Sequence, residues 1–386
     1  MKYWFGYLVA AIIACLTWVL MQFGERFSTL VDMVYPYVIR TLQGILAQWS
    51  GSVDFLLWQL LAVVLAVVLL ASLVAVLAAK KNVLAWGGWA LSACALVYLL
   101  HTMVWGLNYY AGPLSDDIRM EVSQYTIDEL AEATEYYRDK ANDLAGKMDR
   151  DGSGALAYPE FEELADRAGT GFQMLVYERS YPIFAGSTLP VKKLGWADMY
   201  TSMGITGVTF GITGEAAVNP QIPDVLQPFT MCHEMAHRMC IASERDANFA
   251  AFLACSVHPL VEFEYSGYFM AFRYCYNALA SVKTVAAQEY AAEIRDDINE
   301  KLRKDMNDYS DFFSRNQDAT ATQIADTAND TYLKTSGEQS GIKSYSEVCD
   351  LLVNWHIQEV VLPSIAVEES HFDPYDKTQV DISDIR

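Results

Sequence analysis

The strongest chemical signal in this sequence is the run His233-Glu234-Met235-Ala236-His237. Two histidines four residues apart on a helix lie on one face, so both can bind the same zinc ion. The glutamate that follows the first histidine would lie beside the metal, where it can take a proton from a water molecule. The run therefore predicts a zinc site with Glu234 as the general base. Two ordinary surface histidines are the alternative interpretation.

The residues around this run predict that its helix is buried. Met231, Cys232, Met239 and Cys240 are all apolar. Burying two imidazoles and a carboxylate without partners costs free energy, and a bound metal ion removes that cost. The neighbours therefore favour a zinc site over the surface interpretation.

A catalytic zinc ion needs a third protein ligand and one open coordination position. Ser243, with Asp246 three residues later, is typical of the start of a second helix. Residues 238–242 would then form a short turn between two antiparallel helices and bring Glu244 back towards the histidines. A metzincin would carry a third histidine six residues after His237, and Ser243 at that position excludes this class.

The pattern Glu-x-x-Ala-Asn from Glu244 to Asn248 resembles the ligand helix of gluzincin-type metallopeptidases. The resemblance implies that Glu244 is the third zinc ligand. It also implies that Asn248 steadies one of the histidines by a hydrogen bond. Asp246 is the alternative third ligand.

The chain as a whole resembles a bacterial family of membrane-anchored proteins known as domain of unknown function 3810. The segments that carry this resemblance are residues 105–109, 204–220, 228–255, 264–272 and 344–352. The resemblance implies a membrane-anchored zinc metallopeptidase. Members commonly carry Glu-x-Glu-Ala-Asn, whereas Asp246 stands here in place of the second glutamate. A zinc ligand at that position would have a shorter reach, which favours Glu244.

A small sheet is predicted before the zinc motif, with strands near 207–210 and 216–218. In zinc peptidases an edge strand beside the motif helix pairs with the extended substrate, and 207–218 is the candidate segment here. Glu215 and Asn219 lie at its polar end, where they would either bind a substrate terminus or close a turn. We favour the turn, because such residues are common beside Gly and Pro.

Stabilisation of the developing oxyanion needs a hydrogen-bond donor near the zinc site. The family pattern suggests Tyr265 and Tyr268 for this role. Packing in the hydrophobic core is the alternative for either tyrosine, since the chain contains 23 of them.

Residues 149–160 match the EF-hand calcium loop, with Gly154 at the sharp turn. The ligands would be Asp149, Asp151, Ser153, the carbonyl of Ala155, and Glu160. A single loop with three carboxylates predicts weak calcium binding, with a Kd of about 10⁻⁴ to 10⁻³ M. The alternative is a simple connection between two helices.

Three apolar runs, at about 3–22, 55–79 and 84–107, are long enough to cross a bilayer. The first is too long for a cleavable signal peptide. Lys2 precedes the first run, and Lys80 and Lys81 lie between the other two. The positive-inside rule therefore predicts that the loop 24–52 and everything after residue 106 lie outside the cytoplasm of a bacterial cell.

Charge is distributed unevenly along the chain. Residues 1–106 hold five basic and three acidic residues, which leaves 22 basic and 45 acidic residues in 107–386, a net charge of −23. Nucleic acid is excluded as a partner, because its binding needs clustered Lys and Arg. A transporter is also excluded, because the apolar runs carry no charged residue at mid-depth.

These observations predict an α+β, mostly helical protein. A transmembrane module of three helices (1–106) would precede an extracytoplasmic zincin-like metallopeptidase domain (107–386) with a small edge sheet and an EF-hand-like loop. Within this domain, helices are expected over about 115–148, 160–176, 228–308 and 344–362, while 316–340 would be a loop or a poorly packed helix. The domain would hold Zn²⁺ and Ca²⁺, act on a peptide or protein, and lie against a lipid bilayer.

The alternative function is a non-hydrolytic binding or sensing module on the cell surface, stabilised by the same two ions. In that case a protein side chain would fill the fourth zinc position, and His258, Glu262 and Glu264 are close enough in sequence to be considered. The sequence identifies neither the substrate nor a regulatory partner.

Overall fold

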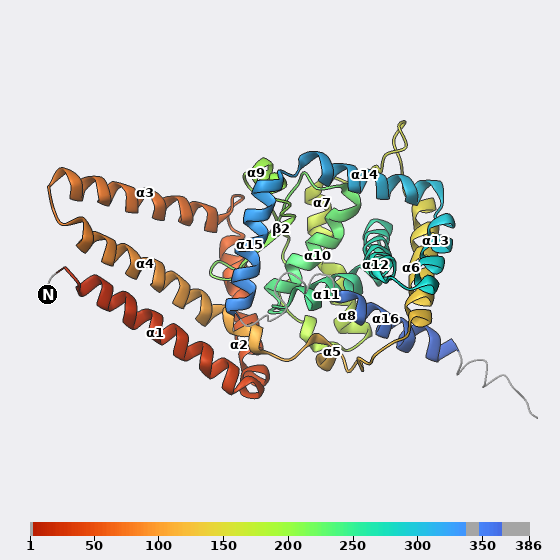
Figure 1. Cartoon of the computed structure of the whole chain (residues 1–386), viewed down its shortest axis with the longest axis horizontal. Coiled ribbons are helices and arrows are strands. Elements are labelled where there is room, and N and C mark those ends of the chain that lie inside the picture. The colour runs from red at the N-terminus through yellow and green to blue at the C-terminus, as the bar shows by residue number, and fades with distance from the viewer. Residues whose placement is uncertain (1–2, 337–346, 365–386) are drawn as a thin grey trace, which may run out of the picture.

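The computed structural model describes residues 3–336 and 347–364, and it is mostly helical (Figure 1). Three helices in this part of the chain are long and apolar enough to cross a membrane. They are α1 (Phe5–Arg26), α3 (Leu57–Ala78) and α4 (Val83–Val104). They agree with the three apolar runs of the sequence and extend from one side of the globular domain (Figure 1).

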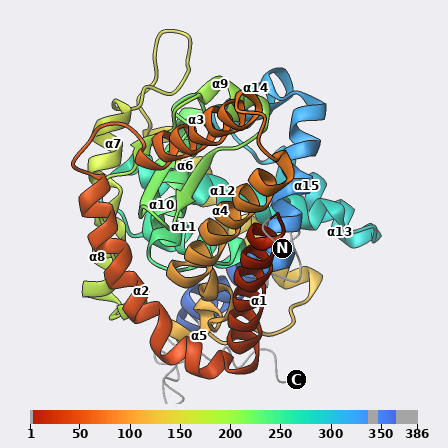
Figure 2. The same ribbon diagram turned by 90° about the vertical axis from the view of Figure 1, so that its left-hand side faces the viewer.

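The segment between the first two spans, expected only as a connecting loop, forms a fourth long helix, α2 (Ser28–Ser50). One of its faces is buried against the rest of the protein, through residues that include Val31, Ile39 and Gln43. Their spacing follows the helical period, which explains why the segment is a helix although Pro36 lies inside it. Figure 2 looks along the spans and shows α2 running across their domain-side ends.

Small residues bring α1 and α4 into close contact. A Cβ atom on Gly6 would overlap the backbone of Gly88, so only glycine fits there. Ser92 donates a hydrogen bond to the carbonyl of Gly6 at 2.7 Å. Such close approach through small residues is typical of helix pairs in membranes.

The globular domain is built around α12 (Val261–Ser281), which packs against α6 (Ile127–Lys147), α11 (Glu244–Ser256) and α16 (Val348–His356). Large buried aromatic rings, among them Phe252, Phe263 and Phe269, fill the space between these helices. α10 (Gln227–Arg238), all of whose residues are buried, packs against α11 and α12. The other longer helices are α8 (Gly169–Glu178), α13 (Val285–Asp296), α14 (Glu300–Asn316) and α15 (Ala319–Ser336). The shorter elements are η1 (Gly106–Tyr110), α5 (Leu114–Asp117), α7 (Phe161–Arg167), η2 (Pro182–Phe184), α9 (Ala197–Ser202), η3 (Asp224–Leu226) and η5 (Ile357–Val361).

The expected helical regions are therefore present but more divided than the sequence suggested. Residues 118–126 separate α5 from α6, and 228–308 contains parts of five helices. The segment 316–340, expected as a loop or a poorly packed helix, contains α15 in its described part.

The described residues contain one small sheet of three strands in the order β1-β3-β2. The strands are β1 (Lys192–Lys193), β2 (Gly207–Phe210) and β3 (Glu215–Val218). β3 is buried and pairs with β1 in parallel and with β2 antiparallel. β2 is thus an edge strand, at the position that the sequence predicted.

The EF-hand-like loop connects α6 to α7, so helices flank it on both sides. Its Asp151 carboxylate accepts hydrogen bonds from the backbone N–H groups of Ser153 and Ala155, at 2.8 and 3.0 Å. Among the described residues, the side chains of Asp149, Asp151 and Glu160 do not form a group with metal-binding spacing. Calcium binding at this loop therefore stays a prediction.

Candidate metal centre

α10 and α11 pack against each other and are joined by the short turn 239–243. Every residue of α10 is buried, as its apolar flanks predicted. Cys240 adopts a left-handed conformation with φ of 74°, and the backbone N–H of Ile241 donates to the carbonyl of Ala236 at 3.1 Å. This turn reverses the chain, so that Glu244, the first residue of α11, faces His237.

The expected cap of α11 is not formed, although the helix begins where the sequence predicted. Ser243 makes no side-chain cap hydrogen bond. Glu244 and Asp246 in the first turn instead place negative charge at the positive end of the helix dipole.

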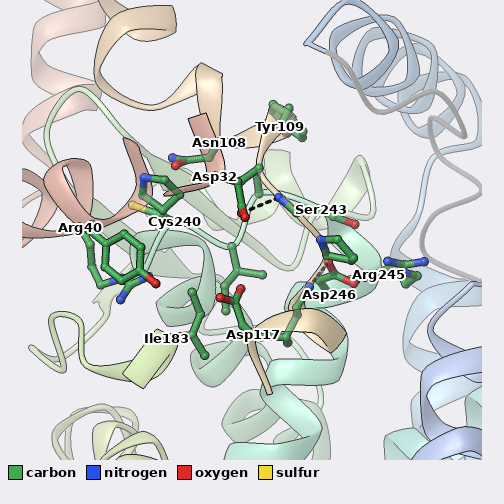
Figure 3. Close-up of a pocket in the computed structure, with 18 of the residues that line it drawn as sticks. Asp32, Arg40, Asn108, Tyr109, Asp117, Ile183, Cys240, Ser243, Arg245 and Asp246 are labelled. Atoms are coloured by element: carbon green, nitrogen blue, oxygen red, sulfur yellow. Dashed lines mark hydrogen bonds and ion pairs between the residues drawn. The ribbon is translucent and has the colours of Figure 1, made fainter. Parts of the chain in front are cut away.

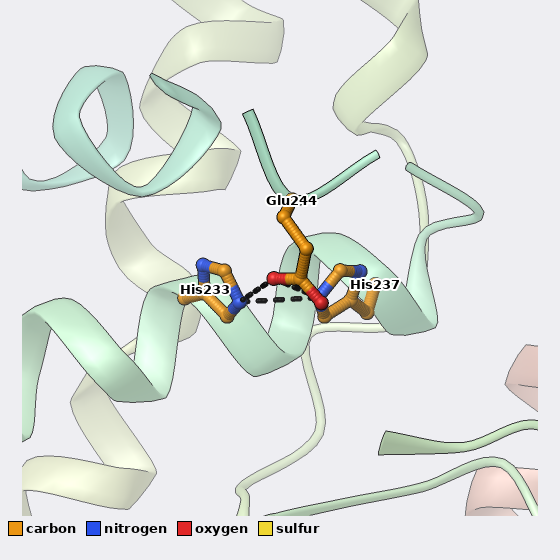
Figure 4. A group of neighbouring side chains, drawn as sticks. All are labelled: His233, His237 and Glu244. Carbon is orange, nitrogen blue, oxygen red and sulfur yellow. Dashed lines mark hydrogen bonds and ion pairs between the residues drawn. The ribbon is translucent and has the colours of Figure 1, made fainter. Parts of the chain in front are cut away.

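His233, His237 and Glu244 converge on one point (Figure 4). The two Nε2 atoms are 3.1 Å apart, and Glu244 Oε2 lies 3.2 Å from His233 Nε2 and 3.5 Å from His237 Nε2. Ligand atoms bonded to a tetrahedral zinc ion at 2.0–2.1 Å are separated by about 3.3 Å. The three side chains therefore fit a zinc ion, and no fourth side chain of the described residues joins them at metal-binding spacing.

The charges of this group are strongly coupled because all three side chains are buried. Burial by itself would lower the pKa of His237, but the Glu244 carboxylate raises it to about 9. Burial would raise the pKa of Glu244, but the two imidazoles hold it well below its usual value. Without a metal ion, the Glu244 carboxylate therefore favours the protonated form of His237. A divalent cation can replace that proton.

The outer nitrogen atoms of the two histidines differ in their partners. His237 Nδ1 lies 2.8 Å from the carbonyl of Ile241, which directs Nε2 towards the centre of the group. His233 Nδ1 and Asn248 Nδ2 are both buried, and neither has a hydrogen-bond partner in the described part of the chain. The hydrogen bond expected between Asn248 and a histidine is therefore not formed.

Glu234 lies beside this group, against the edge strand β2. Its Oε2 atom is 2.7 Å from the hydroxyl of Thr209, and burial raises the pKa of the carboxyl group. A Cβ atom on Gly207 would overlap the Glu234 carboxylate, so glycine is required for β2 to approach α10. The general-base candidate thus lies between the His-His-Glu group and the edge strand.

A cavity of about 820 Å³ opens at the His-His-Glu group. β2 and the loop before it form one wall, and α15 forms another through Ile324, Asp326 and Tyr332. Trp105 and Tyr109, which directly follow α4, complete the lining. The indole N–H of Trp105 donates to the carbonyl of His237 at 3.3 Å.

Residues 31–353 match the family model described as "Protein of unknown function (DUF3810)". The chain belongs to the DUF3810 family. No curated protein and no solved structure matches it. The family resemblance seen in the sequence is thereby confirmed, while the description of the family specifies no activity.

Asp246 of this DUF3810 chain, the alternative third ligand, points away from the histidines. Its carboxylate accepts hydrogen bonds from the backbone N–H of Leu114 at 3.0 Å and from Arg245 at 2.9 Å. It lines a second cavity, of about 250 Å³, into which Asp32 and Asp117 also point (Figure 3). Burial, together with the charge of Asp32, raises the pKa of Asp117 to about 6.

Tyr265 and Tyr268 do not reach the metal centre. The hydroxyl of Tyr265 donates to Asp305 at 2.5 Å, and the ring of Tyr268 packs edge-on against Phe252. Both lie in the core, as the alternative interpretation held. The tyrosines that line the cavity are Tyr109 and Tyr332, whose ring centroids are 6.1 Å apart.

Glu215 and Asn219 both have structural contacts. Glu215 accepts hydrogen bonds from the backbone N–H groups of Leu57 and Trp58, at 2.8 and 2.9 Å, and pairs with Lys192. It thereby caps the N-terminus of the span α3. Asn219 closes a turn, since its Oδ1 accepts from the backbone N–H of Gln221 at 3.0 Å.

His258 also lies away from the zinc motif. Its ring bonds to the carbonyl of Arg167 at 3.1 Å and to the backbone N–H of Leu260. Among the described residues, the side chains with metal-binding spacing are His233, His237 and Glu244, and neither Glu262 nor Glu264 joins them.

Proposed function

We propose that this protein is a membrane-anchored zinc metallopeptidase that hydrolyses peptide bonds in a peptide or protein substrate. The observation that carries the proposal is the triangle of His233 Nε2, His237 Nε2 and Glu244 Oε2, with edges of 3.1, 3.2 and 3.5 Å. Three ligands with an open fourth position are typical of catalytic zinc sites, whereas structural sites are closed by four protein ligands. Bound zinc would supply a Lewis acid and lower the pKa of a coordinated water.

Glu234 has the position and the chemistry of the general base. Its carboxylate lies beside the ligand group on the same helix, and burial raises its pKa. A raised pKa makes the carboxylate a better proton acceptor. Glu234 would take a proton from the attacking water and pass it to the leaving amine.

β2 supplies the surface for the substrate backbone. Residues 207–209 line the cavity, and β3 occupies only one side of the strand. The other side leaves main-chain groups that an extended peptide can pair with, as in strand addition. Thr209 holds Glu234 next to this edge, so a bound peptide would lie within reach of the general base.

Tyr109 and Tyr332 take the place of Tyr265 and Tyr268 as candidate donors to the developing oxyanion. Both line the cavity beside the His-His-Glu group, and phenolic hydroxyls are suitable donors. We expect Tyr332→Phe to lower kcat more than it raises KM.

The lysines at the ends of the spans favour an extracytoplasmic domain. Lys80 and Lys81 lie in the turn between α3 and α4, at the end of the spans away from the domain. By the positive-inside rule this end faces the cytoplasm.

The experiment that tests the function uses the full chain, purified in detergent and loaded with zinc. A mixture of peptides is incubated with the wild-type protein and with Glu234→Gln, and the products are identified by mass spectrometry. We expect cleavage by the wild type only, with equal zinc content in both proteins. Cleavage retained by Glu234→Gln would overturn the mechanism, and a zinc-loaded wild type that cleaves no peptide would favour the binding module.

A further inference from the structure

The helix α2 has two faces of different character, and one of them is fixed to the domain. Arg40 donates from Nε to the carbonyl of Met239 at 3.2 Å, next to the turn between α10 and α11. Gln43 donates to the carbonyls of Gly211 and Val104, at 2.8 and 3.1 Å. These buried contacts hold α2 rigidly beside the metal centre.

The opposite face of α2 is an exposed, mostly apolar stripe that also contains the polar residues Thr41 and Gln48. Its large apolar side chains are 49–80% exposed. They are Leu30, Met33, Val34, Tyr37, Val38, Ile45 and Trp49. The charged residues of α2, which the structure describes in full, are Asp32 and Arg40, and neither is exposed. An uncharged apolar face of this size on a water-facing helix would be unfavourable.

The position of α2 indicates what covers this stripe. Its N-terminus follows the span α1 directly, and six residues separate its C-terminus from the span α3. It crosses the domain-side ends of the spans rather than running parallel to them (Figures 1 and 2). Where α1 and α3 cross the bilayer, both ends of α2 therefore lie at the membrane surface. Tyr37 and Trp49 on its exposed face are residue types enriched at that depth.

The metal centre lies close to the same surface. Trp105 follows the last residue of the span α4, and its ring centroid is 6.2 Å from that of His237. Tyr332, in the wall of the cavity, lies 3.0 Å from Nε2 of His101 in the last turn of α4. One end of the cavity is therefore lined by residues that directly follow the C-terminal end of α4 or contact it.

We propose that α2 lies in the plane of the membrane surface, with its apolar stripe at the boundary between headgroups and acyl chains. The cavity then opens at the membrane surface, and its substrate is the membrane-proximal, extended segment of a polypeptide anchored in the same bilayer. The substrate class rests on the proposed function, whereas the position of α2 does not. The occupant of the stripe is lipid, not a soluble partner or a second copy of the chain.

The position of α2 is tested with spin labels on the full chain in lipid nanodiscs. Cys15 and Cys94, the exposed native cysteines of the described residues, are replaced by alanine. Labels are then attached at Val38→Cys on the stripe and at Val285→Cys, a valine on α13 at the far end of the domain. The two valines are matched in exposure, at 60% and 74%.

We expect the label at position 38 to collide with oxygen several-fold more often than with a water-soluble nickel chelate, and the label at 285 to show the reverse. Equal nickel access at both positions would overturn the proposal. Protection of position 38 from both reagents would also overturn it, because protein rather than lipid would then cover the stripe.

The substrate class is tested with one peptide sequence anchored in the same nanodisc by a single span. The cleavage site is placed either about 5 or about 30 residues from the span. The near site can reach roughly 17 Å from the span when the chain is extended, whereas the far site is held by a long flexible tether. We expect at least ten-fold faster cleavage of the near site, and loss of this preference in Val38→Glu. Equal rates at both distances would overturn the substrate class. Cleavage of neither site, with label 38 still in lipid, would overturn the peptidase function alone.

Discussion

Trp105 and His237 are joined by a hydrogen bond from the indole N–H to the backbone carbonyl, at 3.3 Å. Trp105 is the first residue after the span α4, and His237 belongs to the candidate metal centre. The bond thus directly links the end of a helix apolar enough to cross a membrane to the His-His-Glu group. Because Trp105 is buried and also packs against Tyr109, the position of the span and the shape of the cavity depend on each other.

Gly207 allows the edge strand to approach Glu234, so its substitution should reduce peptide hydrolysis without changing metal binding. In Gly207→Ala the new methyl group would displace the Glu234 carboxylate. We expect peptide hydrolysis to fall at least 100-fold, about 2.7 kcal/mol in activation free energy, while zinc content is unchanged. Gly146→Ala is the matched control, since a Cβ there meets nothing within 4 Å. Full activity of Gly207→Ala would show that the position of Glu234 does not matter.

Glu215 connects the sheet to α3, one of the helices apolar enough to cross a membrane, and its removal should destabilise the protein. Its side chain is fully buried and pairs with Lys192, so Glu215→Gln should lower the free energy of unfolding by about 3–5 kcal/mol. The neighbouring pair Lys193–Glu162 is largely exposed, so Glu162→Gln should leave the free energy of unfolding nearly unchanged. Thermal unfolding of the two variants in the same detergent compares them. Equal melting temperatures would contradict the capping role of Glu215.

The protonated state of His237 predicts how the stability of the metal-free protein depends on pH. Its pKa is raised from 6.5 to about 9 by Glu244, so the contribution to stability is complete below pH 6.5 and is lost as the pH rises through 9. We expect the melting temperature in the presence of a chelator to fall over this interval. The apparent zinc affinity should rise over the same interval, as the competing proton leaves. In His237→Gln, the pH dependence of the melting temperature and that of the zinc affinity should both disappear. A wild-type melting temperature that does not fall between pH 6.5 and 9 would argue against the ion pair.

Calcium binding at residues 149–160 can be measured separately from zinc. We expect a Kd of about 10⁻⁴ to 10⁻³ M by titration of the full chain, and its loss in Asp149→Ala. Asp311→Ala is a control, because that exposed aspartate pairs with Arg315 on α14, outside the loop. A titration without any saturable binding would leave the loop as a connection between α6 and α7.

The sequence was sufficient to predict that His233, His237 and Glu244 come together, because all three lie within one helix–turn–helix segment. His233 to Glu244 spans twelve residues, so helical periodicity and one turn determine their arrangement. The three long apolar helices could be predicted equally well, because a continuous apolar run of about 20 residues is recognised without any knowledge of the tertiary structure.

The remaining cavity wall comes from residues whose sequence carries no such signal. α15 is rich in Thr, Ala and Asp and has few buried side chains, so neither its helical state nor the position of Tyr332 could be inferred locally. Tyr265 and Tyr268 have a spacing that is equally compatible with a core face and a cavity face, and tertiary packing placed them in the core. α2 was missed because Asp32, Pro36 and Arg40 interrupt its apolar pattern.

The central claim, a zinc ion held by His233, His237 and Glu244, is tested most directly by elemental analysis of the purified full chain. We predict about one zinc per chain in the wild type, and its loss in His233→Ala and in Glu244→Ala. His258→Ala and Asp246→Asn, which change a buried histidine and a buried aspartate outside the group, should both keep the metal. A wild-type protein without zinc after metal-replete preparation, or zinc retained by Glu244→Ala and lost from Asp246→Asn, would contradict the account.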